Sequence, residues 1–346
     1  MRVLGIESSC DETAAAVVEG EGLEAVRLLS NVVRDQIAEH APFGGVVPEV
    51  ASRAHVRHIG LVVKAALQKA GLGPGELDGL AVTLGPGLIG GLLVGLSTAQ
   101  GLAMATGLPL VAIHHMEGHL VSPFLQPEND FRGFPFVALL VSGGHTLLVL
   151  AQRFGEYRLL GRTRDDAVGE AFDKGARVLG VGYPGGPAIA RLALGGRVDA
   201  VPFPRVLLDK AGCDFSFSGL KTSLRVFMER LQQTPRPDLS LGDIAASYQE
   251  AIVDTLVEKS LTACRRCEVN TLLVAGGVGA NVRLREKLTA AGERFGLRIG
   301  YPPLNLCTDN GAMVALAGLQ RLKLGQGQRV ASLSLDARPR WSLEEI

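Results

Sequence analysis

Residues 2–20, RVLGIESSCDETAAAVVEG, have the pattern of an apolar strand, a polar turn and a second apolar strand. The pattern recurs about 135 residues later at 135–155, PFVALLVSGGHTLLVLAQRFG. The polar turns are Ser8 to Thr13 in the first copy and Ser142, Gly143, Gly144 and His145 in the second. A polar turn between two apolar strands can hold a phosphate through its backbone N–H groups. The repeat predicts a duplicated α/β lobe; the alternative is two unrelated hairpins.

Length and composition are those of a globular protein. The chain has 346 residues, enough for two domains, and 47% of them are hydrophobic. Its 44 glycines favour a ligand site built from tight loops on an α/β scaffold. The 35 basic and 35 acidic side chains cancel, so no overall field attracts a polyanion. A nucleic acid would therefore need a local basic patch or a helper subunit.

The cysteines and the apolar segments both indicate a cytoplasmic protein. Five scattered cysteines do not form a disulfide framework, and Cys264 and Cys267 make a lone CxxC that gives little support to zinc or redox chemistry. Acidic residues close to the N-terminus argue against a signal peptide. Residues 79–113 carry no charge, but turn signals divide them into a strand, a helix and a strand rather than a membrane span.

Hydrophobic periodicity predicts further elements along the chain. The expected helices cover residues 48–70, 88–106 and 243–264. Strands are expected within 78–87 and 270–276, and Asn281 stands near the start of the helix that follows the second of these strands. No linker divides the chain, so we expect two packed lobes with the ligand site in the cleft between them.

Small residues recur every four positions along the helix expected at 88–106. Gly87, Gly91, Gly95 and Ala99 form a ridge of tiny side chains, so another element packs unusually close there. That element is either the chain's own sheet or a helix of a partner protein.

Three of the seven histidines crowd into IHHMEGHLVSPF, residues 113–124. His115 and His119 share a helical face, as in the zinc protease motif HExxH. Glu117, however, lies about 180° from the middle of that face, whereas the HExxH glutamate lies about 80° from it. The pair can still bind a metal, with Asp309 of LCTDNGAM as the third ligand. Two histidines and one carboxylate with open positions favour Fe²⁺, and Zn²⁺ is also compatible.

Another polar cluster lies in the second half of the chain. Asp173 and Lys174 stand in a helix expected to end near Gly180, before a Tyr-Pro-Gly-Gly turn at 183–186. Asp173 could accept hydrogen bonds from ribose hydroxyls or an amine; the alternative is a surface pair with Lys174.

Ten motifs follow one another along nearly the whole chain, from Arg2 to RPRW at 338–341. They are GIESSCDET, GGVVPEVASRAH, GPGLIGGLLVG, HHMEGHL, LLVSGGHT, GEAFDK, YPGG, FSFSGLKT, AGGVGAN and CTDNGAM. In this order they resemble the bacterial tRNA N6-adenosine threonylcarbamoyltransferase family, once described as O-sialoglycoprotein endopeptidases.

The resemblance implies a duplicated two-lobe α/β fold of the actin, sugar-kinase and Hsp70 type with an interlobe cleft. The implied N-terminal lobe is 1–113 with 327–346 and carries partner-binding helices; the implied C-terminal lobe, 114–326, carries the metal and adenylate site. The implied reaction transfers a threonylcarbamoyl group from L-threonylcarbamoyladenylate to N6 of the adenosine 3′-adjacent to the anticodon. Its products are N6-threonylcarbamoyladenosine, in tRNAs that read ANN codons, and AMP.

The resemblance also assigns residues by motif. His115, His119 and Asp309 are the implied ligands of one divalent metal. Asp11 and Glu12 are candidate catalytic residues that would orient the reacting groups. The implied contacts to the adenylate, or to ATP in the same site, are Leu140, Val141, Ser142, Gly143, Gly144, Asp173, Gly186 and Asn281.

The implied partners are tRNA, an inactive actin-fold paralogue and a small P-loop ATPase, with no membrane. We expect the paralogue to bind at the glycine ridge and the helix at 48–70.

Three other functions stay open at this point. A metalloendopeptidase would use the histidines, but the position of Glu117 argues against it. A small-molecule kinase of the same fold would generally employ Mg²⁺ on oxygen ligands and has no obvious use for two histidines. A noncatalytic ATP-dependent module would bind nucleotide and partners without modifying tRNA.

Overall fold

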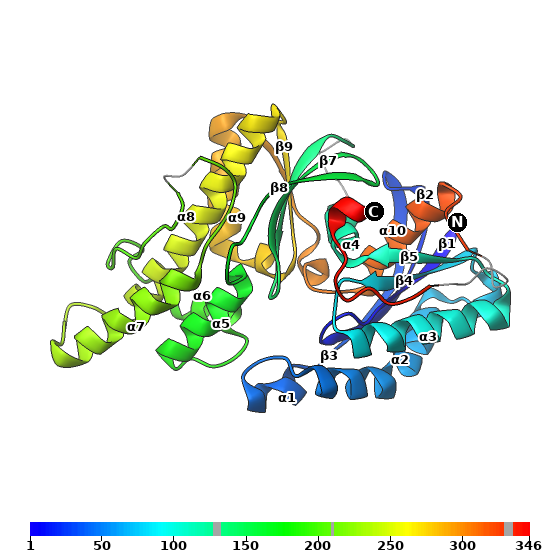
Figure 1. Cartoon of the computed structure of the whole chain (residues 1–346), viewed down its shortest axis with the longest axis horizontal. Coiled ribbons are helices and arrows are strands. Elements are labelled where there is room, and N and C mark those ends of the chain that lie inside the picture. The colour runs from blue at the N-terminus through cyan, green and yellow to red at the C-terminus, as the bar shows by residue number, and fades with distance from the viewer. Residues whose placement is uncertain (127–132, 209–210, 329–334) are drawn as a thin grey trace. The chain divides into compact units, whose positions relative to one another are not determined.

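The computed structural model describes residues 1–126, 133–208, 211–328 and 335–346. The chain divides into two compact units, one of Met1–Asn129 with Pro302–Ile346 and the other of Asp130–Tyr301. Each unit has a five-stranded sheet and a hydrophobic core of its own (Figure 1).

The sheet of the first unit has the strand order β3-β2-β1-β4-β5. Its strands are β1 Arg2–Glu7, β2 Glu12–Gly22, β3 Ala25–Asp35, β4 Gly79–Gly85 and β5 Leu110–His114. β2 runs antiparallel to β1 and β3, whereas β4 runs parallel to β1 and β5. The first predicted hairpin is confirmed as β1 and β2, and the strand expected within 78–87 is confirmed as β4.

Helices cover both faces of this sheet (Figure 1). α2 (Pro48–Ala70) and α3 (Ile89–Thr106), both as predicted, pack on the face to which Ile6 and Val82 contribute. α10 (Gly311–Lys323) lies on the other face, where Gly5 lets it approach β1, and the short α4 (His115–Val121) packs on α10. The one-turn α1 spans Ile37–His40. Because successive strand residues point to opposite faces, Gly5 and Ile6 serve different helices.

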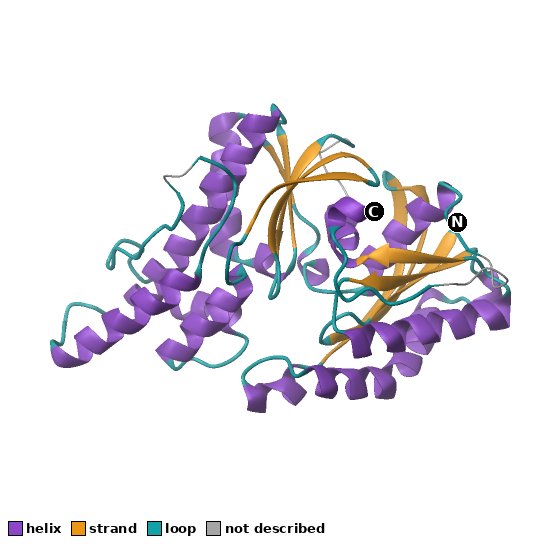
Figure 2. Ribbon diagram, in the orientation of Figure 1, coloured by secondary structure: helices purple, strands orange, loops and turns teal. Residues whose placement is uncertain are grey.

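The second unit repeats this plan with the strand order β10-β9-β6-β7-β8. Its strands are β6 Phe136–Val141, β7 Thr146–Arg153, β8 Glu156–Arg162, β9 Thr271–Ala275 and β10 Arg298–Gly300. Its helices are α5 Val168–Leu179, α6 Gly185–Leu192, α7 Ser218–Gln233, α8 Leu241–Cys267 and α9 Val282–Phe295. The long α8 contains the helix expected at 243–264 and packs beside the strands of this unit (Figure 2).

The two sheets have the same topology. β6, β7 and β8 pair antiparallel in succession, as β1, β2 and β3 do. β9 pairs parallel with β6, and β10 with β9, as β4 and β5 do in the first unit. The predicted duplication is therefore confirmed, and two unrelated hairpins are excluded.

The unit boundaries differ from those expected for the lobes. Residues 114–129 and 302–326 are expected in the C-terminal lobe, but they belong to the first unit. The reason is packing: α10 contacts β1, β2 and β4 through close approaches at Gly5, Gly311 and Gly318. α4 then packs on α10 and is retained with it. The metal-binding candidates are therefore residues of the first unit.

The glycine ridge packs on the chain's own first hairpin. A Cβ at Gly87 would lie within 3.0 Å of the carbonyl oxygen of Ser9, and one at Gly91 within 3.0 Å of that of Ser8. Gly95 faces the Ser8 side chain, and Ala99 is fully buried. The expectation that a partner binds at this ridge is therefore wrong, because the β1–β2 turn already fills the space.

The uncharged segment 79–113 forms β4, α3 and β5, as predicted. Among the described residues, α3 is the one helix long and apolar enough to cross a membrane by length and composition, and 33% of that stretch is buried.

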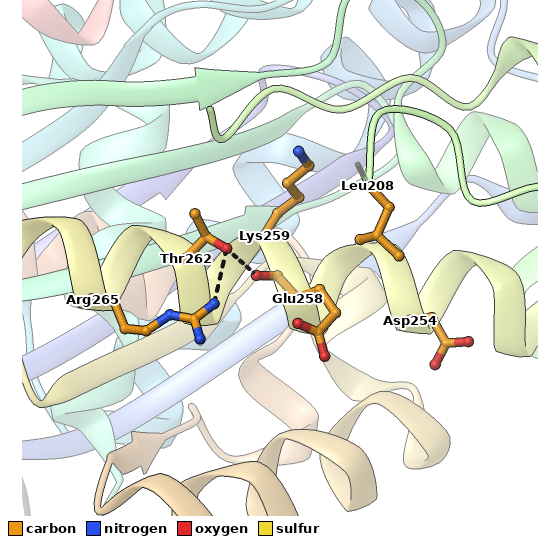
Figure 3. Close-up of a pocket in the computed structure, with 6 residues that line it drawn as sticks. All are labelled: Leu208, Asp254, Glu258, Lys259, Thr262 and Arg265. Atoms are coloured by element: carbon orange, nitrogen blue, oxygen red, sulfur yellow. Dashed lines mark hydrogen bonds between the residues drawn. The ribbon is translucent and has the colours of Figure 1, made fainter. Parts of the chain in front are cut away.

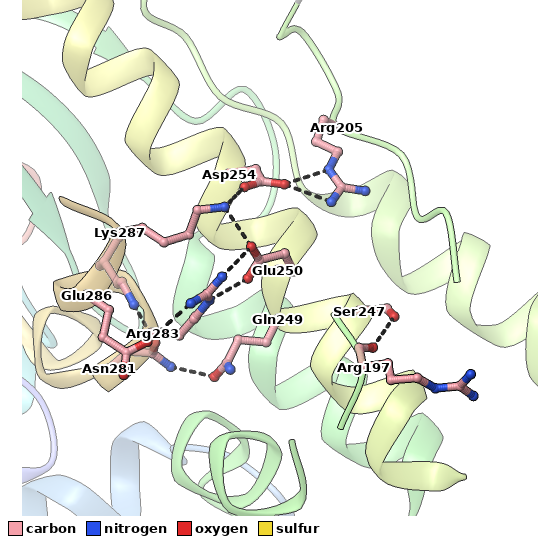
Figure 4. Close-up of polar contacts among 11 residues, drawn as sticks. Arg197, Arg205, Ser247, Gln249, Glu250, Asp254, Asn281, Arg283, Glu286 and Lys287 are labelled. Atoms are coloured by element: carbon pink, nitrogen blue, oxygen red, sulfur yellow. Dashed lines mark hydrogen bonds and ion pairs between the residues drawn. The ribbon is translucent and has the colours of Figure 1, made fainter. Parts of the chain in front are cut away.

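A charged network links α8, α9 and the chain before α7 in the second unit (Figure 4). Glu250 accepts hydrogen bonds from Arg283 Nε at 2.7 Å and from Lys287 Nζ at 2.6 Å. Asp254, one turn further along α8, pairs with Lys287 and accepts from Arg205 Nη2 at 2.7 Å. Each charged group in the network contacts a group of opposite charge. The network therefore stabilises the packing of α8 and α9 and of the chain before α7.

A pocket on α8 in the second unit contains none of the predicted site residues. The pocket, of about 440 Å³, is lined by Leu208, Asp254, Glu258, Lys259, Thr262 and Arg265 (Figure 3). It mixes both signs of charge.

Cys264 is the first cysteine of the CxxC. Burial raises the pKa of its thiol to about 12, so this thiol stays protonated at neutral pH.

Candidate functional site

His115, His119 and Asp309 converge in the first unit. The Nε2 atom of His119 lies 2.9 Å from Asp309 Oδ1, and that of His115 lies 3.4 Å from the same oxygen. One ligand atom from each residue lies within 4.8 Å of the other two. Both imidazoles are buried, and their rings meet edge to face with centroids 4.7 Å apart. Residues from two distant segments thus present three metal-type ligands to one point.

The chain holds Asp309 at this point through the turn before α10. Asn310 caps α10, because its Oδ1 accepts from Met313 N at 3.0 Å. Its Nδ2 donates to the carbonyl oxygens of Leu306 and Thr308. Asn310 is fully buried, and its three hydrogen bonds fix the conformation of the backbone next to Asp309.

The electrostatic surroundings suit a cation. Burial alone would raise the pKa of Asp309 and lower that of His115; their mutual attraction reverses both shifts. Glu7 adds a second carboxylate beside His115, and this one is fully buried. Burial, with Asp309 and Asp11 as negative neighbours, also raises the pKa of Glu12. The excess of acidic groups and the His-His-Asp donor set therefore fit a divalent metal.

Glu117 points away from this cluster, as the helical geometry predicts. It is fully buried and accepts from Arg321 of α10, Nε to Oε2 at 2.6 Å and Nη2 to Oε1 at 2.9 Å. A glutamate held by a guanidinium cannot serve the histidine pair as the base of an HExxH protease.

Asp11 lies in the β1–β2 turn and Glu12 is the first residue of β2; His55 of α2 contacts residues on both sides of the pair. His55 Nε2 lies 2.9 Å from the carbonyl oxygen of Cys10, and its Nδ1 lies 2.8 Å from Thr13 Oγ1. The Ser9 hydroxyl of the same turn lies 3.1 Å from His115 Nδ1. The turn that contains Asp11 and leads into Glu12 is thus adjacent to the histidine pair.

In the second unit the predicted substrate residues Leu140 to Gly144 lie at the end of β6, and Asn281 follows the end of β9. These strands are parallel, so their carboxyl ends lie at one edge of the sheet. Gly143 and Gly144 are exposed, and a Cβ at either would meet no atom within 4 Å. Leu140 and Val141, by contrast, have buried side chains and could contact a ligand only through their backbone.

Asp173 and Gly186 lie next to each other, since Asp173 Oδ1 accepts from Gly185 N at 2.7 Å. Lys174 pairs with Asp166 and Glu170 instead, so the alternative of an Asp173–Lys174 pair is excluded. A Cβ at Gly186 would meet no atom within 4 Å, so the start of α6 is open.

Asn281 caps α9, accepting from Leu284 N at 3.0 Å, and its Nδ2 donates to Gln249 Oε1 at 2.8 Å. The predicted location near the start of a helix is confirmed, and the asparagine has a structural role there.

The family model of tRNA N6-adenosine threonylcarbamoyltransferase matches residues 27–316. A curated protein of that name from Magnetococcus marinus is 59% identical to this chain over 100% of the chain and 99% of its own length. One from Anaeromyxobacter dehalogenans is 53% identical over 99% of each chain. The chain belongs to the tRNA N6-adenosine threonylcarbamoyltransferase family.

Among solved structures, full-length HypF in a phosphate- and nucleotide-bound form aligns with a TM-score of 0.59 and 10% identity. The alignment covers 94% of this chain and 47% of HypF. Together with the repeated sheet topology, this likeness supports the expected fold class for this threonylcarbamoyltransferase family member, a duplicated α/β fold of the actin, sugar-kinase and Hsp70 type.

Sequence reasoning missed two residues that shape the site of this family member. Glu7 contacts His115, and His55 holds the β1–β2 turn. Glu7 could have been found because it is a carboxylate at the end of an otherwise apolar strand. Burying an unpaired charge there would cost free energy, so a partner is expected. The signal for His55 was its place as the last residue of the motif GGVVPEVASRAH, to which no role was assigned.

Proposed function

We propose that this chain transfers the threonylcarbamoyl group of L-threonylcarbamoyladenylate to N6 of the adenosine 3′-adjacent to the anticodon in tRNAs that read ANN codons. Membership of the transferase family, with relatives matched over their full length, carries this proposal. The enzyme is then an acyltransferase, and we place it in the cytoplasm, where tRNA is modified.

The reaction needs positioning more than a protein nucleophile, because the donor is a mixed carbamic-phosphoric anhydride. The N6 amine attacks the carbamoyl carbon, a C–N bond forms, the bond to the phosphate oxygen breaks, and AMP leaves. The amine is a poor nucleophile and loses a proton, for which Asp11 is the proposed acceptor. Glu12, whose raised pKa favours its protonated form, is proposed to orient the donor through a hydrogen bond.

For the adenylate we propose the edge of the second sheet, formed by Leu140 to Gly144 with Asp173, Gly186 and Asn281. The open space above Gly143, Gly144 and Gly186 supports this, because a ligand can approach the backbone closely there. Backbone N–H groups of the turn would then face the phosphate or the developing oxyanion. ATP is the alternative occupant of the same positions.

For the metal we propose one divalent cation on His115, His119 and Asp309, with Fe²⁺ favoured over Zn²⁺ by the donor set. The convergence of the three ligand atoms and the surplus of acidic groups support this. A cation bound there supplies a Lewis acid for substrate oxygens.

For partners we propose tRNA, an inactive actin-fold paralogue and a small P-loop ATPase. The chain has equal numbers of acidic and basic side chains, which supports a need for helpers in holding tRNA. With the glycine ridge occupied, we now assign the paralogue to the outer face of α2 and α3. Large apolar side chains are exposed on these helices, among them Val56, Leu61, Ile89 and Leu93.

The change Leu61→Asp is expected to weaken association with the paralogue by at least about 10-fold, because it places a charge in an apolar interface. Leu61 is 67% exposed, so the fold should tolerate the change. Sedimentation of the mixed proteins measures the association. The matched control is Leu194→Asp in the second unit, where Leu194 is 80% exposed. Equal association of the two variants would refute this surface.

The test of the activity follows labelled threonylcarbamoyl from its adenylate to unmodified tRNA, with both partner proteins present. Wild type should incorporate label, and Asp11→Asn should do so more slowly by at least about 100-fold, the lower end of the usual range for general-base catalysis. Full transfer by Asp11→Asn would refute the proposed role of Asp11 but not the transferase activity. No incorporation by an assembled wild-type complex would refute the transferase and favour a kinase or a binding module.

A further inference from the structure

Glu7 is a fully buried carboxylate in contact with His115. Its Oε2 lies 3.1 Å from His115 Nδ1, and Thr83 Oγ1 donates to the same oxygen at 2.6 Å. Its Oε1 accepts from Ser9 N at 2.6 Å. Both carboxylate oxygens are therefore engaged, which explains how a charge survives where the side chain is 0% exposed.

The register of the sheet delivers Glu7 to this position. Gly5 faces α10, so Glu7, two residues further along β1, points to the same side. β1 and β4 pair with Gly5 opposite Ala81, and Ala81 also faces α10. Thr83 therefore follows Ala81 to the side on which Glu7 stands, and α4 brings His115 there. A slip of one residue would turn Glu7 to the opposite face.

The hydrogen bonds around Glu7 place a proton on Nδ1 of His115, a nitrogen that the Ser9 hydroxyl also contacts, at 3.1 Å. An ionised carboxylate only accepts hydrogen bonds, so Nδ1 of His115 must carry the proton that it donates to Glu7. In the neutral ring Nε2 is then left with a free lone pair. Nε2 is the atom that faces Asp309 and the proposed metal position.

We infer that Glu7 is a positioning residue for the metal site, which fixes the tautomer and the orientation of His115 so that Nε2 is free to bind the cation. This inference rests on the proposed metal site but not on the transferase activity. Carboxylates in this relation to a metal-binding histidine typically raise metal affinity by about 10- to 100-fold.

The second histidine has no such support. Nδ1 of His119 is buried and has no hydrogen-bond partner among the described residues. Glu7 therefore supports His115 alone, whereas the contact that orients His119 is the one from its Nε2 to Asp309 Oδ1, at 2.9 Å.

The change Glu7→Gln separates this role from mere packing, because the amide cannot satisfy all three neighbours in the same way. Ser9 N is a fixed donor, so the amide oxygen must take the place of Oε1. The amide NH₂ then faces Thr83 and His115, and Nδ1 of His115 has to accept instead of donate. The ring proton moves to Nε2, the atom needed for the metal.

Zn²⁺ titration against a chromophoric chelator is the test, with thermal unfolding of the metal-free proteins as the check on folding. Affinity of Glu7→Gln should fall by about 10- to 100-fold relative to wild type. The matched control is Glu117→Gln, which neutralises another fully buried glutamate of the first unit that contacts Arg321 rather than His115. Its affinity should stay within about 3-fold of wild type. Equal losses in the two variants, or none in Glu7→Gln, would overturn the role of Glu7.

If Glu7→Gln does not fold, ¹⁵N NMR of histidine-labelled wild type loaded with Zn²⁺ decides. The resonance of His115, assigned by its absence from His115→Ala, should show a protonated Nδ1. A protonated Nε2 would overturn the inference. A folded wild type that binds no divalent metal would instead refute the metal site of the proposed function, whatever its transferase activity.

Discussion

The His115→Ala variant is expected to lose its bound divalent metal and to transfer threonylcarbamoyl at least about 100-fold more slowly than wild type. The imidazole supplies one of three converging ligand atoms and lies between the carboxylates of Glu7 and Asp309. Removing it takes away one of the three ligands and leaves the buried carboxylate of Glu7 without its imidazole partner. Metal content per chain and label incorporation into tRNA measure the two effects.

The control for this variant is His58→Ala, which removes a half-buried histidine of α2 outside the cluster. It should keep the metal content of wild type. Full metal content in His115→Ala would refute the ligand assignment, whereas loss of transfer with metal retained would give His115 a role in chemistry other than ligation.

The Gly5→Ala variant is expected to lower the free energy of unfolding by about 3 kcal/mol, at the upper end of the usual cost of overpacking. A Cβ at Gly5 would lie within 3.0 Å of Ala315 N and of the carbonyl oxygen of Gly311. Both are backbone atoms of α10 and cannot rotate away, so the helix has to shift from β1. Asp309 lies two residues before the start of α10, so metal affinity should fall with stability. Chemical denaturation and Zn²⁺ titration measure both.

Gly60→Ala is the matched control, because Gly60 lies in α2 with no atom within 4 Å of the added Cβ. It should raise stability by up to about 1 kcal/mol, the usual gain of alanine over glycine in a helix. If Gly5→Ala were as stable as wild type, the close packing of α10 on β1 would be contradicted.

The sequence predicted the elements whose patterns are local. Both hairpins, the helices α2 and α3, and the strand-turn-helix that places Asn281 at a cap were all correct. Strand alternation and helical periodicity depend on residues two to four positions apart, so they can be read along the chain. The direction of Glu117 away from the histidine pair followed from the same periodicity and is confirmed by its bonds to Arg321.

The tertiary structure alone decided which distant segments meet. Whether the glycine ridge faced a partner or the chain itself depended on where the β1–β2 turn packs, and it packs on the ridge. The assignment of α4 and α10 to the first unit depended on glycines that let α10 approach the sheet. Glu7 and His115 are 108 positions apart and meet because strand register turns one side chain toward the helix that carries the other. Local patterns thus determined the elements and the candidate ligands. Strand register and close packing determined how the site is built around those ligands, because both arise only between distant segments.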